Sequence, residues 1–140
     1  MYASQRSNKS PSVFVAAKAT TPIPVRHELV RHALIQAALD PAVRAIEFIP
    51  TVTAYGSVIE INAVVLRGDD GGQILDVVET RPVRGLDDEA LALLAIDRLG
   101  MQTITLSATD IGRQPRAANC RLVWACRHHR VSAGDRVRVL

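Results

Sequence analysis

Three β-rich stretches joined by short turn signals occupy the middle of the chain, and they constrain its fold more than any other feature. The stretches are residues 43–54, 57–67 and 73–81. Tyr55-Gly56 separates the first two, and Gly-Asp-Asp-Gly-Gly at residues 68–72 separates the second from the third. Glycine and aspartate in such clusters are typical of tight turns. Because consecutive strands with short connections pair with one another, we expect an antiparallel meander.

A helix is expected before the meander, between Val25 and Leu39. Apolar residues recur there at helical spacing, and polar residues share the opposite face. The apolar set is Val30, Ala33, Leu34 and Ala37, and the polar set is His27, Glu28, Arg31, His32 and Gln36. Asp40-Pro41 should end the helix, because proline cannot continue it.

A helix, a strand and a second helix are expected after the meander. Asp87, Asp88 and Glu89 place negative charge in the first turn of a helix that runs to Leu99 and stops at Gly100. Residues 101–107 should form a strand, and residues 116–127 a helix that Pro115 can begin. The predicted fold class is therefore α/β, a single domain over residues 25–130 with a central mixed sheet flanked by helices.

The two ends of the chain give weaker patterns. Residues 1–24 lack sustained periodicity and include Pro22 and Pro24, so we expect an extended or disordered arm with no core of its own. Residues 131–140 alternate arginine and valine near their end, which fits a basic edge strand or tail.

Composition excludes several classes of protein. A chain of 140 residues with 48% hydrophobic residues is long enough to bury one core. Its longest apolar runs, such as residues 91–96, are far below the roughly 18 residues of a membrane span. No secretory leader pattern precedes them, so we expect a cytoplasmic protein without a membrane. Cys120 and Cys126 lack the spacing of a zinc site.

Charge is segregated along the chain. Residues 1–46 carry six Lys/Arg against two Asp/Glu, residues 47–110 carry four against eleven, and residues 111–140 carry seven against one. Basic terminal segments on either side of an acidic central segment suit a protein whose basic surfaces bind a polyanion and whose acidic residues form a cation-binding site between them. We therefore expect double-stranded DNA to be bound by Arg113, Arg116, Arg127 and Arg130.

The acidic middle of the chain contains a candidate metal site. Glu79 and Arg81 lie two apart at the end of the third predicted strand, so they should leave one face of the sheet, and Glu60 and Asn62 share a face of the second strand by the same rule. Glu28 on the first helix can pack beside them. Such a set could hold Mg²⁺, which polarises a phosphodiester and activates water while a nearby cation stabilises the transition state.

The order of elements and several local phrases resemble the PD-(D/E)XK nucleases, in particular the TnsA-type endonucleases that nick DNA at transposon ends. The similarity covers about residues 25–130. The phrases are Glu28, residues 40–44 leading to Ile49-Pro50, residues 78–81, Gly100-Met101 running to residues 109–111, residues 118–121 and Trp124.

The resemblance implies four catalytic positions, two of which depart from the family pattern. Glu28 matches the helical metal ligand and Glu79 matches the acidic residue of the third strand. Asn62 stands where the family has aspartate, and Arg81 stands where it has lysine. Asparagine lacks the negative charge that attracts Mg²⁺, and arginine is bulkier than lysine and stays protonated. Glu60, one pleat before Asn62, could replace the missing aspartate, so the implied metal ligands are Glu28, Glu60, Asn62 and Glu79.

Three functions remain open from the sequence. The first is a DNA-binding subunit with lost or reduced cleavage, which the resemblance would place beside a transposase or another DNA-processing protein. The second is a divergent Mg²⁺-dependent endonuclease. The third is a small regulatory adaptor that binds another protein.

Overall fold

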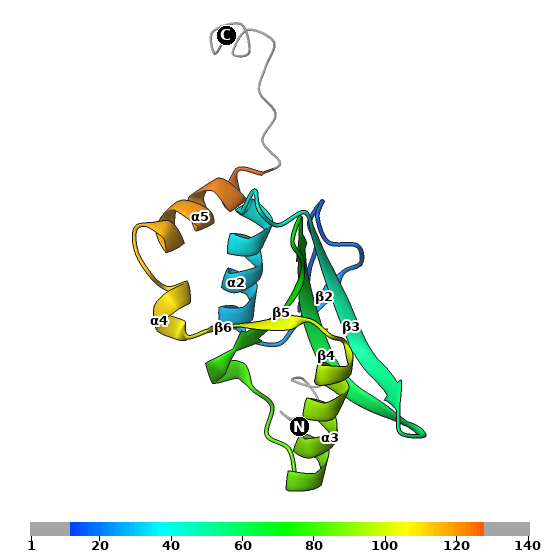
Figure 1. The fold of residues 1–140 in the computed structure, drawn as a ribbon. Coiled ribbons are helices and arrows are strands. Elements are labelled where there is room, and N and C mark those ends of the chain that lie inside the picture. Colours follow the sequence, from blue (N-terminus) through cyan, green and yellow to red (C-terminus); the bar gives the residue numbers. More distant parts are fainter. Residues whose placement is uncertain (1–11, 128–140) are drawn as a thin grey trace, which may run out of the picture.

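A mixed four-stranded sheet lies at the centre of the protein (Figure 1). The computed structural model describes residues 12–127. The sheet strands are β3 (Ala45–Ala54), β4 (Ser57–Gly68), β5 (Gly71–Val77) and β6 (Gln102–Leu106). The remaining elements are the strands β1 (Ser12–Phe14) and β2 (Ile23–Val25), the helices α2 (Glu28–Leu39), α3 (Leu86–Arg98), α4 (Ala108–Ile111) and α5 (Arg116–Ala125), and the 3₁₀ turn η1 (Val78–Thr80).

The strands follow the order β3-β4-β5-β6 across the sheet. β3, β4 and β5 pair antiparallel, as the turn signals predict, and α3 carries the chain across to β6, which pairs parallel with β5. Tyr55 and Gly56 both have positive φ in the first turn, which matches the tight hairpin that their pairing favours. The α/β class and the mixed sheet are therefore as predicted.

Helices cover both faces of the sheet. Residues 63–66 of β4 are all buried. Val64 and Leu66 belong to the apolar cluster that includes α2, whereas Ala63 and Val65 belong to the cluster that includes α3. A strand buried on both sides needs an unbroken apolar run, and β4 supplies it. The protein is thus built in three layers, with α2 and its neighbours on one face and α3 on the other.

The N-terminal segment is extended, and it adds to the main core. β1 and β2 pair antiparallel. Phe14 is 1% exposed and Ile23 is fully buried, and the Phe14 ring stacks on Trp124 of α5 with 5.2 Å between centroids. The sequence of this segment shows only short apolar groups, so its burial depends on contacts with residues far along the chain.

A bulge interrupts the pairing of β3 with β4. The register shifts between Ile49 and Thr51, so two residues of β4, Ile61 and Asn62, lie opposite Pro50. Asn62 adopts a positive φ of 48°, a conformation that asparagine tolerates better than most residues. The bulge places an irregular, exposed polar position directly before the buried run at residues 63–66.

Two of the expected segments lie outside the described residues: most of the arm at residues 1–11, and the basic tail at 131–140. Among residues 12–127, no helix has the length and apolar character needed to cross a membrane.

Candidate functional site

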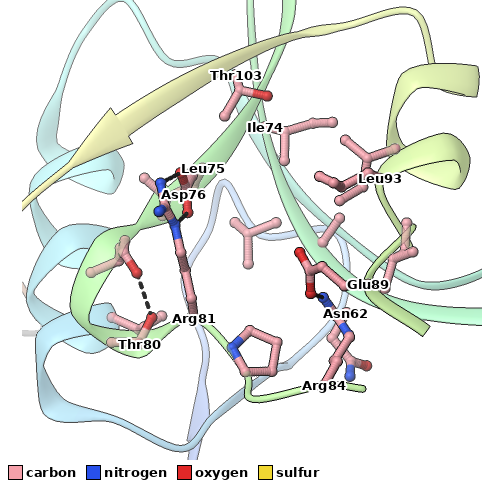
Figure 2. Close-up of a pocket in the computed structure, with 17 residues that line it drawn as sticks. Asn62, Ile74, Leu75, Asp76, Thr80, Arg81, Arg84, Glu89, Leu93 and Thr103 are labelled. Carbon is pink, nitrogen blue, oxygen red and sulfur yellow. Dashed lines mark hydrogen bonds and ion pairs between the residues drawn. The ribbon is translucent and has the colours of Figure 1, made fainter. Parts of the chain in front are cut away.

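A pocket of about 460 Å³ opens where β4 and β5 meet α3 and the segment that precedes this helix (Figure 2). Apolar residues such as Val30, Ile74 and Leu93 form part of its wall. Its polar lining consists of Asn62, Asp76, Thr80, Arg81, Arg84 and Glu89. The pocket therefore holds two carboxylates and two guanidinium groups.

Asp76 and Arg81 form a bidentate ion pair at one side of the pocket (Figure 2). Arg81 donates from Nε to Oδ1 at 3.0 Å and from Nη2 to Oδ2 at 2.6 Å. Thr105 on β6 donates its hydroxyl to Oδ2 at 3.2 Å. The pKa of Asp76 is held below its usual value, first by the hydrogen bonds from Arg81 and also by the positive charge of Arg81 and the hydrogen bond from Thr105. Partial burial of Asp76 opposes this shift. Asp76 is therefore an anion whose charge a guanidinium already neutralises.

A second ion pair lies on the other side of the pocket. Arg84, which is half-buried, approaches Glu89 with 3.4 Å between Nη1 and Oε2. Figure 2 shows Asn62 on this side, next to Arg84. Asn62 also donates its side-chain amide to Glu60 at 3.1 Å, so these two side chains do share one face of β4 as the alternation predicts.

The third strand ends earlier than predicted, and this changes the position of Glu79. β5 stops at Val77, and Glu79 lies in η1, where the Arg81 amide and the Thr80 hydroxyl bond back to the backbone. The prediction that residues 73–81 form one strand, with Glu79 and Arg81 alternating on it, is wrong. Glu79 instead accepts a hydrogen bond from the backbone amide of Ala108 at 2.9 Å, and so fastens the start of α4.

Glu28 also has other partners. It begins α2 with its side chain 78% exposed, and it lies 3.8 Å from Arg31 and 3.7 Å from His32 of the same helix. Across residues 12–127, no three His, Cys, Asp or Glu side chains come together in a way that could hold a metal ion. The predicted ligand set of Glu28, Glu60, Asn62 and Glu79 is therefore not gathered into one site. The acids that line the pocket, Asp76 and Glu89, are each paired with arginine, so the pocket does not fit a Mg²⁺ ion well.

The predicted DNA contacts gather around α5. Arg113 lies 3.5 Å from the Asp110 carboxylate, and Arg116 donates to the Asp110 carbonyl at 2.6 Å. Hydrogen bonds from the Ser107 backbone and hydroxyl hold the pKa of Asp110 below its usual value. Arg127 lies over the Trp124 ring, 4.1 Å from its centroid, whereas Arg130 falls outside the described residues.

Arg121 was not singled out in the sequence, although it belongs to the same basic segment. It is exposed on α5, and no acid within residues 12–127 forms an ion pair with it. We call the exposed side chains of Arg113, Arg116, Arg121 and Arg127 the arginine face. Asp76 was also missed, since a lone acid within an apolar strand gives no local signal that an arginine five residues later will bind it.

The Asp76 pair leads to a testable pH dependence. Because the folded-state pKa of Asp76 is lowered, the pair stabilises the fold fully above the unfolded value of about 3.8, and this stability is lost as the pH falls through the folded-state pKa. Asp76→Asn should lower the free energy of unfolding by about 1–2 kcal/mol at a pH of about 6. In urea titrations, the difference in the free energy of unfolding between Asp76→Asn and the native protein should become smaller as the pH falls below the unfolded-state pKa of Asp76. Asp69→Asn, at the more exposed pair with Arg44, is the control and should change little.

The pocket and the arginine face share no residue. Comparison with family models, curated proteins and solved structures found nothing that matches the chain. The function is therefore inferred from the geometry of these two regions.

Proposed function

We propose that the protein binds DNA, has a TnsA-like PD-(D/E)XK fold with lost or reduced cleavage activity, and acts in a DNA-processing or mobile-element complex. The observation that carries DNA binding is the arginine face. Its four guanidinium groups are exposed, and Asp110 is the one acid between residues 108 and 127. A guanidinium group can donate two parallel hydrogen bonds to one phosphate. A cluster of exposed arginines is therefore typical of surfaces that bind nucleic acids.

The dimensions of α5 suit several phosphate contacts. α5 has 10 residues and is therefore about 15 Å long, and Arg113 lies before its first residue. Contacts to the Asp110 carbonyl and the Trp124 ring hold Arg116 and Arg127 in position. We propose that the arginines contact phosphates, and because phosphate contacts carry no sequence information, the binding should be largely independent of sequence.

Reduced cleavage is proposed from the ion pairs in the pocket. A divalent cation at Asp76 or Glu89 would have to displace the guanidinium group of Arg81 or Arg84. The order of α2, three strands, α3, β6 and α5 supports the likeness to the nucleases, and the departures at Asn62 and Arg81 support loss of activity. A divergent endonuclease is the second candidate, because Asn62, Asp76 and Glu89 bring side-chain oxygens to one pocket.

DNA binding can be tested by fluorescence anisotropy with a labelled duplex of about 20 base pairs. If about four phosphates are contacted, the native affinity should fall roughly 10²-fold between about 50 and 200 mM salt. The variant Arg116→Ala/Arg121→Ala removes two contacts, so the slope of log affinity against log salt should become shallower by about 2. The loss should be similar for duplexes of different sequence.

The matched control is Arg44→Ala/Arg98→Ala, which removes the same charge from exposed arginines outside the arginine face. This control should keep the native salt slope. Equal losses in both variants would mean that net charge, and no defined face, governs binding. Absence of binding by the native protein at low salt would contradict the proposal and favour the adaptor.

A further inference from the structure

The outer side of α3 is apolar, and no element within residues 12–127 covers it. The helix packs on the sheet through the small residues Ala92 and Ala95, which are 1% and 0% exposed. Its large side chains remain exposed: Leu86 and Leu94 are 88% and 48% exposed, and Leu93, which also borders the pocket, is 58% exposed. With Ala90 they follow the spacing i, i+4, i+7 and i+8, which places them on one side of a helix. We call these four residues the leucine face.

The leucine face has an acidic border. Asp87 and Asp97 belong to the same exposed side of α3, and neither forms an ion pair with any residue of the described part of the chain. An apolar stripe with acids beside it is complementary to an apolar stripe with exposed bases beside it.

α5 offers that complement. Leu122 and Val123 are 68% and 55% exposed, and they follow Arg121 directly on α5. α5 packs with α2 on one side of the sheet, and α3 covers the other side (Figure 1). One chain therefore cannot bring its own two faces together, whereas two copies can.

We propose that the leucine face of one copy binds α5 of a second copy, in a head-to-tail contact between leucines and between acids and arginines. Pairing α3 with α3, or α5 with α5, would oppose like charges, so a two-fold symmetric contact through either helix is disfavoured. Two short helices bury less area than a standard stable interface, so the dissociation constant should be on the order of 10–100 µM. The inference goes beyond DNA binding, although it uses some of the same arginines.

Sedimentation velocity over about 1–200 µM protein, without DNA, tests the contact. The variant Leu86→Ser/Leu93→Ser alters only α3, and Arg121→Ala/Leu122→Ser alters only α5. Each change lies at exposed positions, and each variant alone should remain monomeric where the native protein associates, with affinity reduced tenfold or more. Val58→Ser, at an exposed valine outside both helices, is the control and should associate as the native protein does.

The mixture of the two variants gives the decisive result. Only one intact pair of faces remains in it, α3 of one variant and α5 of the other, so an equimolar mixture should form a 1:1 dimer and stop there. A native protein that stays monomeric throughout the range would overturn the proposal. Self-association by either variant alone, or no dimer in the mixture, would overturn it equally. Because no DNA is present, failure of DNA binding would leave this result unaffected.

Discussion

Phe14→Ala is expected to lower the free energy of unfolding by about 3–5 kcal/mol, the largest stability effect we predict. Phe14 is 1% exposed, belongs to the core cluster around α2, and stacks on Trp124. The substitution removes this apolar area and leaves a cavity that the neighbouring side chains cannot fully close. Urea unfolding followed by circular dichroism measures the loss. Fluorescence of Trp124, the single tryptophan of the chain, should change as its ring loses its stacking partner.

Val13→Ala is the matched control, because Val13 is the neighbouring residue of β1 and is 49% exposed. Its effect should stay within about 0.5 kcal/mol. Similar small effects for both substitutions would contradict the assignment of the N-terminal segment to the core.

Asn62→Asp combined with Arg81→Lys should tighten Mg²⁺ binding about tenfold or more over the native protein. The first change adds a negative charge at an oxygen that lines the pocket, and aspartate tolerates the positive φ at this position as asparagine does. The second change replaces the bidentate guanidinium on Asp76 with a single ammonium group, which a cation can displace more readily. Isothermal titration calorimetry with MgCl₂ measures the difference. The native protein should show weak Mg²⁺ binding and little or no cleavage of supercoiled DNA.

The control for this experiment is Asn62→Asp combined with Arg44→Lys, which makes the same arginine-to-lysine change at the Asp69 pair outside the pocket. It should recover only part of the gain. Equal Mg²⁺ affinities for the double variant and the native protein would show that the pocket cannot be converted into a metal site. Efficient Mg²⁺-dependent nicking by the native protein, abolished by Glu89→Gln in the pocket, would favour the endonuclease over the reduced-cleavage proposal.

Much of the fold could be predicted from local pattern. The turn signals locate both hairpins of the meander, although the second turn is only residues 69–70 and its flanking glycines belong to the strands. The acids at the start of α3 mark that helix correctly. The early end of β5 could not be predicted in this way. Val77-Val78 is a β-branched pair that favours a strand, but the contacts of Arg81 with Asp76 and of Glu79 with Ala108 stabilise a turn there.

The candidate site was predicted in part. Asn62 and Arg81 do line one pocket, because the strand pairing brings their elements together. Glu28 and Glu79 have partners elsewhere: Glu28 lies beside His32 of its own helix, and Glu79 accepts a hydrogen bond from the Ala108 amide. The burial of Phe14 depends on residues more than one hundred positions away, and no local periodicity records such a contact.

The stack of Phe14 on Trp124 also affects the order in which the protein can assemble. Because the ribosome synthesises a chain from its N-terminus, the strand that contains Phe14 emerges long before the helix that contains Trp124. Until that helix is made, an aromatic ring and its buried neighbours stay exposed to water or find temporary contacts. Closing so long a loop is slow compared with forming a hairpin or a helix. During synthesis, the position of α5 and of its arginines is therefore among the last features of this domain to become fixed.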